Sequence, residues 1–168
     1  MRSSLTDARS LPDVFQVWNF DLYVPSMPGG GDSRSLAAKV QTTSVPGVTI
    51  EPVVVPLHGV EVVYAGREVF AHTLECTAVE MRDMATRNAI RRWMNFARSQ
   101  RSNSGSFKTE YAVTVELVLY DDIPAPIKSI FLENAWPSAI ADLALDGSAS
   151  TAASYSWTFS YDTFYETF

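Results

Sequence analysis

The chain has 168 residues, of which 46% are hydrophobic and 12% aromatic, and its formal net charge is −6. This composition excludes a disordered chain and favours one folded domain, residues 1–168, with a single core. One cysteine excludes an internal disulfide, and because the sequence shows neither an apolar leader nor a run of roughly 18 apolar residues, we expect a soluble protein without a signal peptide.

Strand patterns dominate the first part of the chain. Residues 14–24, VFQVWNFDLYV, are rich in β-branched and aromatic side chains and end before Pro25. After a loop rich in glycine and proline, residues 36–45, LAAKVQTTSV, predict a second strand that ends before Pro46.

Residues 49–66, TIEPVVVPLHGVEVVYAG, are apolar and β-branched but are interrupted by Pro52 and Pro56. Proline cannot donate a hydrogen bond to a sheet, so we expect the prolines to prevent normal pairing and the segment to form an extended arm or a long hairpin. Such an arm, bounded at residues 45–66, exposes apolar side chains that a neighbour must cover: Val53, Val54, Val55 and Leu57.

Residues 67–80 alternate as a strand. The predicted core face consists of Phe70, His72, Leu74, Cys76 and Ala78. The opposite face carries Thr73, Glu75 and Thr77.

Residues 83–99 have the one convincing helical pattern in the sequence. Asp83 is the expected N-cap, and the apolar stripe consists of Ala89, Ile90, Trp93, Phe96 and Ala97. Arginines lie off this stripe and face outward: Arg87, Arg91, Arg92 and Arg98. The basic face is either a solvated surface that balances an acidic protein or a surface for a partner.

The last third of the chain returns to strands. Residues 109–122 alternate, residues 126–137 form a strand that Pro137 ends, and residues 138–150 form a helical turn or a connection. The closing strand, residues 154–162, has an aromatic face made by Tyr155, Trp157, Phe159 and Tyr161. We therefore predict a mainly β fold: an antiparallel sandwich or barrel of about six or seven strands with one flanking helix and the arm.

Candidate catalytic and metal-binding residues are few. His72, Glu75 and Cys76 are close in sequence, but on a strand Glu75 points away from the other two, which favours core residues over zinc ligands. Asp121 and Asp122 are typical of a turn at the end of a strand. Without a catalytic set or a phosphate-binding loop, we expect no enzyme activity, no cofactor and no metal.

Small polar side chains occupy the non-core face of three predicted strands: Thr73, Glu75, Thr77, Thr114, Glu116, Ser156, Thr158 and Ser160. Such a face suits a confined water-filled space, because long side chains would obstruct passage. An ordinary solvent-facing side of an antiparallel sheet has the same pattern and stays an alternative.

From about Phe15 to Tyr161, the order of these elements resembles the tail tube proteins of contractile-tailed bacteriophages. The shared order is strand, loop, strand, proline-containing arm, strand, a helix of the RNAIRRWMNF type and the strand VTVELVLYD. The most specific part is Asn-x-Trp-Pro at residues 134–137, followed by small residues and the aromatic strand SYSWTFSYD.

The resemblance implies a hexameric ring in which each subunit gives about four strands to a shared inner β-barrel. Rings stack into a tube inside a contractile sheath, with the arm, residues 45–66, reaching the adjacent ring and the helix, residues 83–99, facing the sheath. The resemblance also implies that the tube conducts DNA into the host. The implied partners are other copies, the sheath, baseplate and tail terminator proteins, and transiently the tape measure protein and DNA. The implied location is the virion, after assembly in the host cytoplasm, with no stable membrane association.

Glu75 and Glu116 belong to the faces expected to line the lumen, where their carboxylates would repeat around the ring, repel DNA weakly and let it slide. We expect Glu116→Lys to permit tubes but to slow or block DNA ejection. A closely related alternative is the tube of a type VI secretion system, a bacteriocin or another contractile injector. A nucleic-acid-binding module using the arginine-rich helix conflicts with the sequence pI of about 4.8. A small-ligand barrel or an enzyme would need polar groups inside the core.

Overall fold

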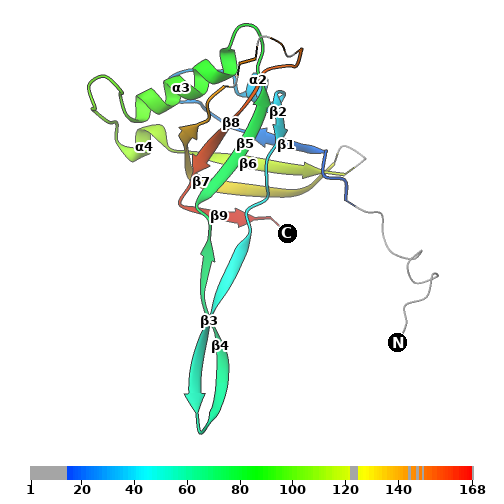
Figure 1. Cartoon of the computed structure of the whole chain (residues 1–168), viewed down its shortest axis with the longest axis vertical. Helices are drawn as coiled ribbons and strands as arrows, with labels where there is room; N and C mark the ends of the chain where they lie inside the picture. Colours follow the sequence, from blue (N-terminus) through cyan, green and yellow to red (C-terminus); the bar gives the residue numbers. More distant parts are fainter. Residues whose placement is uncertain (1–14, 122–124, 144, 147, 149, 168) are drawn as a thin grey trace, which may run out of the picture.

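The computed structural model describes residues 15–121, 125–143, 145–146, 148 and 150–167. These residues form a body from which one long hairpin projects (Figure 1). The body has seven strands: β1 (Phe20–Tyr23), β2 (Val40–Thr42), β5 (Thr73–Val79), β6 (Val113–Tyr120), β7 (Pro126–Ile140), β8 (Ser154–Ser160) and β9 (Thr163–Glu166). The remaining described elements are β3 (Val48–Leu57) and β4 (Val60–Phe70), which make the hairpin, and the helices α2 (Ser33–Ala37), α3 (Ala85–Ala97) and α4 (Lys108–Tyr111). The prediction of a mainly β, antiparallel fold with a flanking helix is confirmed.

Strand β7 links two parts of the body sheet, and all pairs are antiparallel. Residues 126–135 of β7 pair with β6, which pairs with β1, while β9 pairs with β7 as well; we call this part sheet A. Residues 136–140 of β7 pair with β8, which is followed by β5 and β2; we call this part sheet B. Asn134, with a φ of 53°, lies where β7 passes from one part to the other.

Pro137 does not end the strand, contrary to the prediction. β7 continues to Ile140 with a register shift between Pro137 and Ala139. Irregular positions bend a strand and tolerate proline, because the missing N–H is not needed for a regular ladder there. Residues 138–140 therefore belong to a strand, and the described residues between 141 and 150 form a connection without a helix.

Residues from both sheets and from α3 form one core cluster. The alternation predicted for β5 and β8 is confirmed, because Leu74, Cys76, Trp157 and Phe159 are buried. Sheet A adds Leu22, Val115, Leu117, Ile130 and Leu132 to the same cluster. Burial raises the pKa of the Cys76 thiol to about 12, so this side chain stays protonated and unreactive at neutral pH.

Helix α3 lies at the end of the body opposite the hairpin (Figure 1). Its predicted stripe is confirmed for Ala89, Ile90, Trp93 and Ala97, but Phe96 lies outside the stripe and is 42% exposed. The Trp93 ring packs against Phe159 of β8, so α3 covers the aromatic side of sheet B. No helix among the described residues is both long and apolar enough to span a membrane.

The start of α3 differs from the prediction. Met84, with a φ of 52°, occupies the N-cap position instead of Asp83, whose Oδ1 accepts a hydrogen bond from the Ala85 N–H at 3.1 Å. The carboxylate of buried Glu80 accepts the Arg87 N–H at 2.8 Å. Two carboxylates outside the helix thus satisfy N–H groups of its first turn, which lack partners within the helix.

The N-terminal strands are shorter than predicted. Within residues 15–24 only β1 pairs, and Val17 and Trp18 are exposed; Val14 lies outside the described residues. Of residues 36–45, the first two belong to α2 and only β2 pairs. His72, predicted for the core face, is exposed between β4 and β5. Local composition indicates strand preference, but a strand extends only as far as a partner strand does.

Candidate assembly surfaces

The polar face of sheet B is built from rows of directly paired residues. Thr73 of β5 lies opposite Ser160 of β8, Glu75 lies opposite Thr158, and Thr77 lies opposite Ser156. In this way β5 and β8 bring six of the eight predicted lumen residues together. The aromatic side chains of β8 lie on the other face, under α3, so the polar face and α3 are on opposite sides of sheet B.

Hydrogen bonds tie the hydroxyl groups of this polar face to one another. The Thr77 and Ser156 hydroxyls lie 2.8 Å apart, and Ser160 Oγ donates to Ser138 Oγ at 2.8 Å. Ser138 Oγ in turn donates to the Thr158 carbonyl at 3.2 Å. In the four segments that make sheet B, Glu75 is the only charged side chain. The side chains of this face are therefore mostly short, polar and uncharged.

The structure does not place Thr114 and Glu116 on this surface. Both belong to β6 in sheet A, where Glu116 lies opposite Tyr23 of β1 and Phe131 of β7. Because sheets A and B bury their inner faces in the same core cluster, their outer faces turn away from each other. The eight residues predicted to share one surface therefore divide into a group of six on sheet B and a pair on sheet A.

Both outer edges of sheet B are open among the described residues. β2 pairs only with β5, and residues 136–140 of β7 pair only with β8. Edge strands of this kind present backbone N–H and C=O groups to which another strand can pair. The body thus carries a four-stranded sheet that can be extended on either side.

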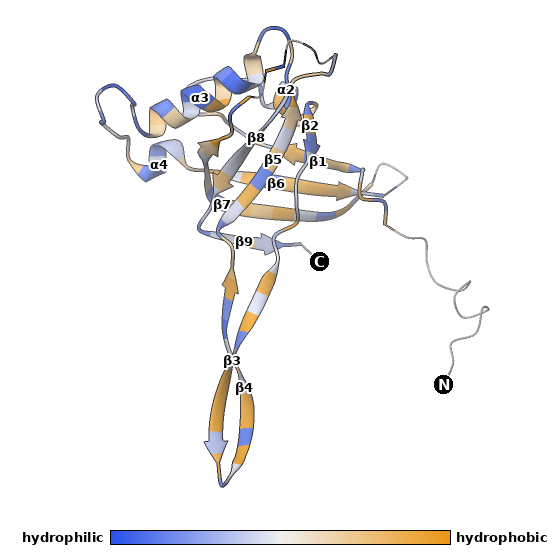
Figure 2. Cartoon of the chain, viewed as in Figure 1, coloured by the Kyte–Doolittle hydropathy of each residue, from blue (hydrophilic) through white to orange (hydrophobic). Residues whose placement is uncertain are grey.

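The hairpin of β3 and β4, which we call the arm, is mostly hydrophobic, with a few charged residues such as Glu61 (Figure 2). One face of its outer part carries Val53, Val55, Leu57, Val60, Val62 and Tyr64, which lie opposite one another in pairs. The other face carries Val54 and Val63, which also pair with each other. Val53, Val54 and Leu57 are about half exposed, and Val55 is partly buried. No residue of the arm is buried in the isolated chain.

The prolines do not prevent pairing in the arm, contrary to the prediction. Pro52 lies opposite Ala65 and Pro56 lies opposite Glu61. Pro52 and Pro56 are four residues apart, so their backbone nitrogens point to the same side of β3. This is compatible with the open edge of the hairpin, where no N–H donor is required. A register shift near Gly66 separates the inner and outer parts of the arm, and a Cβ at Gly66 would lie 2.4 Å from the Glu51 carbonyl oxygen.

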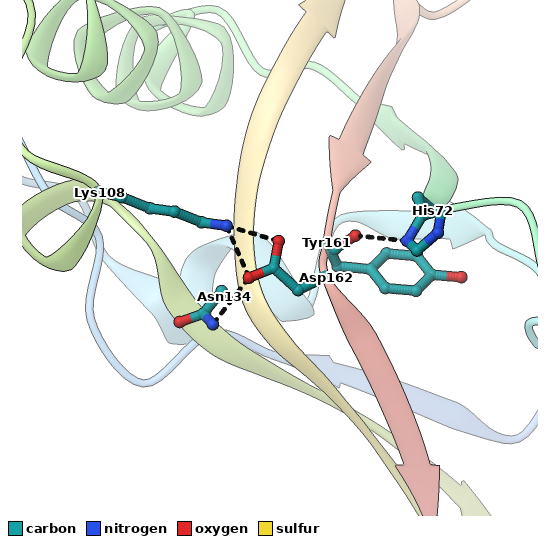
Figure 3. Close-up of polar contacts among 5 residues, drawn as sticks. All are labelled: His72, Lys108, Asn134, Tyr161 and Asp162. Atoms are coloured by element: carbon teal, nitrogen blue, oxygen red, sulfur yellow. Dashed lines mark hydrogen bonds and ion pairs between the residues drawn. The ribbon is translucent and has the colours of Figure 1, made fainter.

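The base of the arm is held by aromatic rings. Phe70 at the end of β4 contacts His72 (4.5 Å between ring centroids), Tyr161 (6.1 Å, stacked) and Phe164 (5.2 Å, edge to face). The Tyr161 carbonyl oxygen lies 3.2 Å from His72 Nδ1 (Figure 3).

The next residue along the chain, Asp162, forms a polar clamp that the sequence analysis missed. Lys108 Nζ of α4 lies 2.5 Å and 2.6 Å from the two oxygens of Asp162, and Asn134 Nδ2 of β7 donates to Oδ2 at 2.9 Å (Figure 3). These bonds hold the pKa of Asp162 below its usual range, chiefly through Lys108. The clamp joins residues 28 and 54 positions from Asp162, so no local sequence signal marks it.

The four arginines predicted to face outward have different environments. Arg87 Nη1 donates to the Ala141 carbonyl at 3.2 Å, and its guanidinium lies 5.8 Å from the centre of the Tyr155 ring, so Arg87 is fixed to the body. The other three are exposed: Arg91 donates to Gln100, Arg92 to the Asn88 carbonyl and Arg98, just beyond α3, to Asn103. Among the described residues, no carboxylate pairs with any of these arginines.

Within the described residues, no group of three or more His, Cys, Asp or Glu side chains is arranged to hold a metal ion. Comparison with known proteins assigns the chain instead to a structural family. A family model described as "Phage tail tube protein" matches residues 19–167. The chain belongs to the phage tail tube protein family. It is 28% identical over 134 residues to the curated tail tube protein of Serratia phage KSP90, a match that covers 79% of this chain and 75% of the relative.

Solved structures of tube proteins have the same fold as this tail tube protein. The tube of an extracellular contractile injection system, solved as a sheath–tube complex, superposes with a TM-score of 0.65 at 14% identity over 99% of both chains. The sheath/tube terminator of that system gives a TM-score of 0.69 at 13% identity, over 94% of this chain and 99% of the other. A type six secretion system protein gives 0.52 at 11% identity, over 88% and 82% of the two chains. These likenesses support the family assignment at the level of the fold.

Proposed function

We propose that this tail tube protein is the major subunit of a tube made of stacked hexameric rings, which lies inside a contractile sheath and conducts viral DNA into the host. The main support for this proposal is sheet B, which combines four strands, a nearly uncharged polar face and two open edges.

Sheet B is suited to form part of a barrel shared between copies. Pairing of β2 of one copy with residues 136–140 of β7 of the next would satisfy both open edges and continue the sheet around a ring. Six copies of four strands make a barrel of two dozen strands, and because barrel diameter grows with strand number, this bore is wider than the aqueous channel of a porin with about 16–18 strands. The hydroxyl face points into the bore, and α3 lies outside.

The electrostatics of sheet B suit the passage of a polyanion. Lysine and arginine in the bore would bind phosphate groups and hold DNA in a salt-dependent way, but the segments of sheet B contain neither. Glu75 is exposed on the polar face, and one copy per subunit gives a ring of weakly repelling carboxylates. Thr114 and Glu116 lie on the outer face of sheet A and are therefore not part of the proposed bore.

The arm connects successive rings in this proposal. Its outer part exposes apolar side chains on both faces, and an apolar ribbon that projects from the body needs a partner to remove it from water. Val53, Val54, Val55 and Leu57 are the residues that we expect to be covered by the adjacent ring.

The exposed arginines of α3 are proposed to face the sheath. Arg91, Arg92 and Arg98 have no carboxylate partner among the described residues, so an acidic surface on the sheath would complement them. Arg91→Glu with Arg92→Glu should leave tube assembly intact and impair sheath assembly; contractile tails of normal appearance would contradict this role.

The remaining partners follow from the same proposal. The baseplate and the tail terminator bind the two ends of the tube, and the tape measure protein and DNA occupy the bore transiently, which places the protein in the virion after assembly in the host cytoplasm. The alternative, a tube that passes proteins in a type VI secretion system or another injector, has the same fold. The match to a phage family model favours DNA, and neighbouring genes for a capsid and a terminase would separate the two.

Negative-stain microscopy of the recombinant protein tests the proposal directly. We expect rings or hollow rods, at least tenfold fewer rods for Val63→Asp in the arm, and no such loss for Phe107→Asp, a similarly exposed site near α4. A monomer that forms no ring or rod at any concentration or salt tested would contradict the proposed function.

A further inference from the structure

A second apolar surface of this protein lies on the body, close to β1. It is lined by the segment that precedes β1, by the start of β1, by the loop that follows β2 and by β6. The groove has a volume of about 190 Å³ and is lined by Phe15, Val17, Phe20, Thr43, Ser44, Val45, Leu117 and Leu119. We call it the β1 groove. Val17 is 83% exposed and Phe15 and Val45 are about half exposed, so the groove opens to the surface.

The β1 groove differs in its charge from four other grooves, three on the body and one at the base of the arm. Each of those four contains at least one charged side chain: Asp32, Arg91, Glu51 and Asp21 are examples, one from each groove. The lining of the β1 groove has none. When an apolar segment enters a groove, any charged side chain that lines the groove loses its contact with water, which costs free energy. The β1 groove has no such side chain, so it is the most suitable of the five for the apolar arm.

The arm of the same chain cannot fill its own groove. Val45 lies three residues before β3 begins, so the groove is next to the base of the arm. The ten residues of β3 extend by about 3.4 Å each, which places the tip roughly 34 Å away from the base. An arm that occupies the groove must therefore belong to a second copy.

We propose that the tip of the arm of one copy inserts into the β1 groove of a copy in the adjacent ring, with Leu57 and Val60 as the inserted side chains. This inference rests on the proposed tube assembly and names the acceptor site for the arm. Leu57 and Val60 pair with each other beside the turn at His58 and Gly59, and they are 45% and 65% exposed. An apolar cavity of about 150 Å³ holds a benzene molecule, so a groove of this size accepts these two side chains but not the whole arm.

The proposed contact also explains how rings can stack without limit. The arm and the groove are different surfaces of one chain, so their contact is head to tail and leaves a free groove or a free arm at each end of the stack. A contact in which identical surfaces faced each other would end at a pair of rings.

Cross-linking in assembled rods tests the proposal. Val60→Cys at the arm tip is combined with Val17→Cys in the groove, and as a matched control with Phe107→Cys, which is similarly exposed at 79%. The native Cys76 is buried and does not react. With a short bismaleimide, we expect the first pair to give ladders of linked subunits on a denaturing gel, with at least fivefold more product than the control pair.

The outcomes separate this inference from the proposed function. The rods could form normally while Val60→Cys cross-links to Phe107→Cys as efficiently as to Val17→Cys, or does not cross-link to Val17→Cys at all. Either result would overturn the groove assignment but not the proposed tube. Absence of rods from the wild-type protein would overturn both. If the cysteine variants do not assemble, the charge pair Val60→Lys and Val17→Glu tests the contact instead. Each substitution alone should reduce the number of rods at least tenfold, and the two together should restore them. Failure of the double variant to restore rods would refute the contact.

A different occupant is also distinguishable. If residues 1–14 of the same chain covered the groove, their deletion would raise maleimide labelling of Val17→Cys in the unassembled protein. We expect labelling that is unchanged by the deletion and reduced at least fivefold on assembly. A rise on deletion would contradict the proposal.

Discussion

The arm and sheet B are both antiparallel β structure, but they bury their side chains in different ways. In β5 and β8 every second side chain is buried, and the intervening ones are small and polar apart from Glu75 and Val79. In β3 and β4 apolar side chains occupy both faces, and none is buried. A strand that alternates finds its core within its own chain, whereas a strand that is apolar on both faces and projects from the body needs a core supplied by another molecule.

The largest expected effect concerns the stability of the two regions. Trp157→Ala removes a side chain that is 1% exposed and leaves a large cavity, so the free energy of unfolding should fall by about 3–5 kcal/mol. Val63→Ala in the arm removes a side chain that is 63% exposed and should change it by less than about 0.5 kcal/mol. Urea denaturation of the unassembled protein measures both. A large loss for Val63→Ala would show that the arm already contributes to the core of the single chain.

The contrast also shows which parts of the fold can be predicted from the sequence. The buried faces of β5 and β8 follow from local alternation, because a period of two is a property of the strand itself. The passage of β7 through Pro137 and the short length of β1 depend on which strands become neighbours. The capping of α3 by Glu80 depends in turn on a close approach of two segments. None of these long-range contacts has a local signal.

The candidate surfaces show the same limit. Alternation separates core from non-core side chains, so it identified the polar faces of β5, β6 and β8 correctly as non-core. It carries no information on which strands share a sheet, so it cannot distinguish Glu116 on sheet A from Glu75 on sheet B. For residues 49–66 the sequence predicts an extended arm or a long hairpin, and the structure has the hairpin. Its prolines do not prevent pairing, because an isolated hairpin has two open edges at which no N–H donor is required.

A smaller loss of stability is expected at the start of α3, in the body. Glu80 is 7% exposed, and its carboxylate accepts N–H groups of Met81 (3.0 Å) and Arg87 (2.8 Å). Glu80→Ala should lower the free energy of unfolding by about 1.5–3 kcal/mol, because hydrogen bonds to a charged group are lost where water is excluded. Asp83→Ala is the matched control with an exposed carboxylate and should cost about 1 kcal/mol or less. Equal losses in urea denaturation would contradict the role given to Glu80.

The polar face of sheet B is tested by a pair of charge reversals. If sheet B lines the bore, Glu75→Lys introduces six cations that bind phosphate groups, and DNA ejection should slow several-fold, more strongly at low salt. Glu116→Lys, on the outer face of sheet A, should leave ejection unchanged, in contrast to the expectation from the sequence alone. Ejection kinetics of phage carrying each variant measure the difference. Slow ejection for Glu116→Lys alone would assign the bore to sheet A.

The smallest expected effect lies at the junction of the two regions, where Asp162 clamps α4 and β7 beside the base of the arm. Lys108 and Asn134 hold the pKa of Asp162 below its ordinary value of about 4, and the His72 charge acts in the same direction. A carboxyl whose pKa is lower in the folded state contributes stability above its unfolded pKa and loses that contribution as the pH falls through its folded pKa.

Asp162→Asn should therefore lower the melting temperature slightly at pH 7, and the two proteins should converge as the pH falls below about 4. The effect is small because Asp162 is exposed and solvent screens its charge. Lys108→Met is the matched variant that keeps the carboxylate but removes its partner, and it should reproduce the loss at pH 7. A difference between wild type and Asp162→Asn that persists unchanged at low pH would show that the clamp acts through the shape of the side chain and not through its charge.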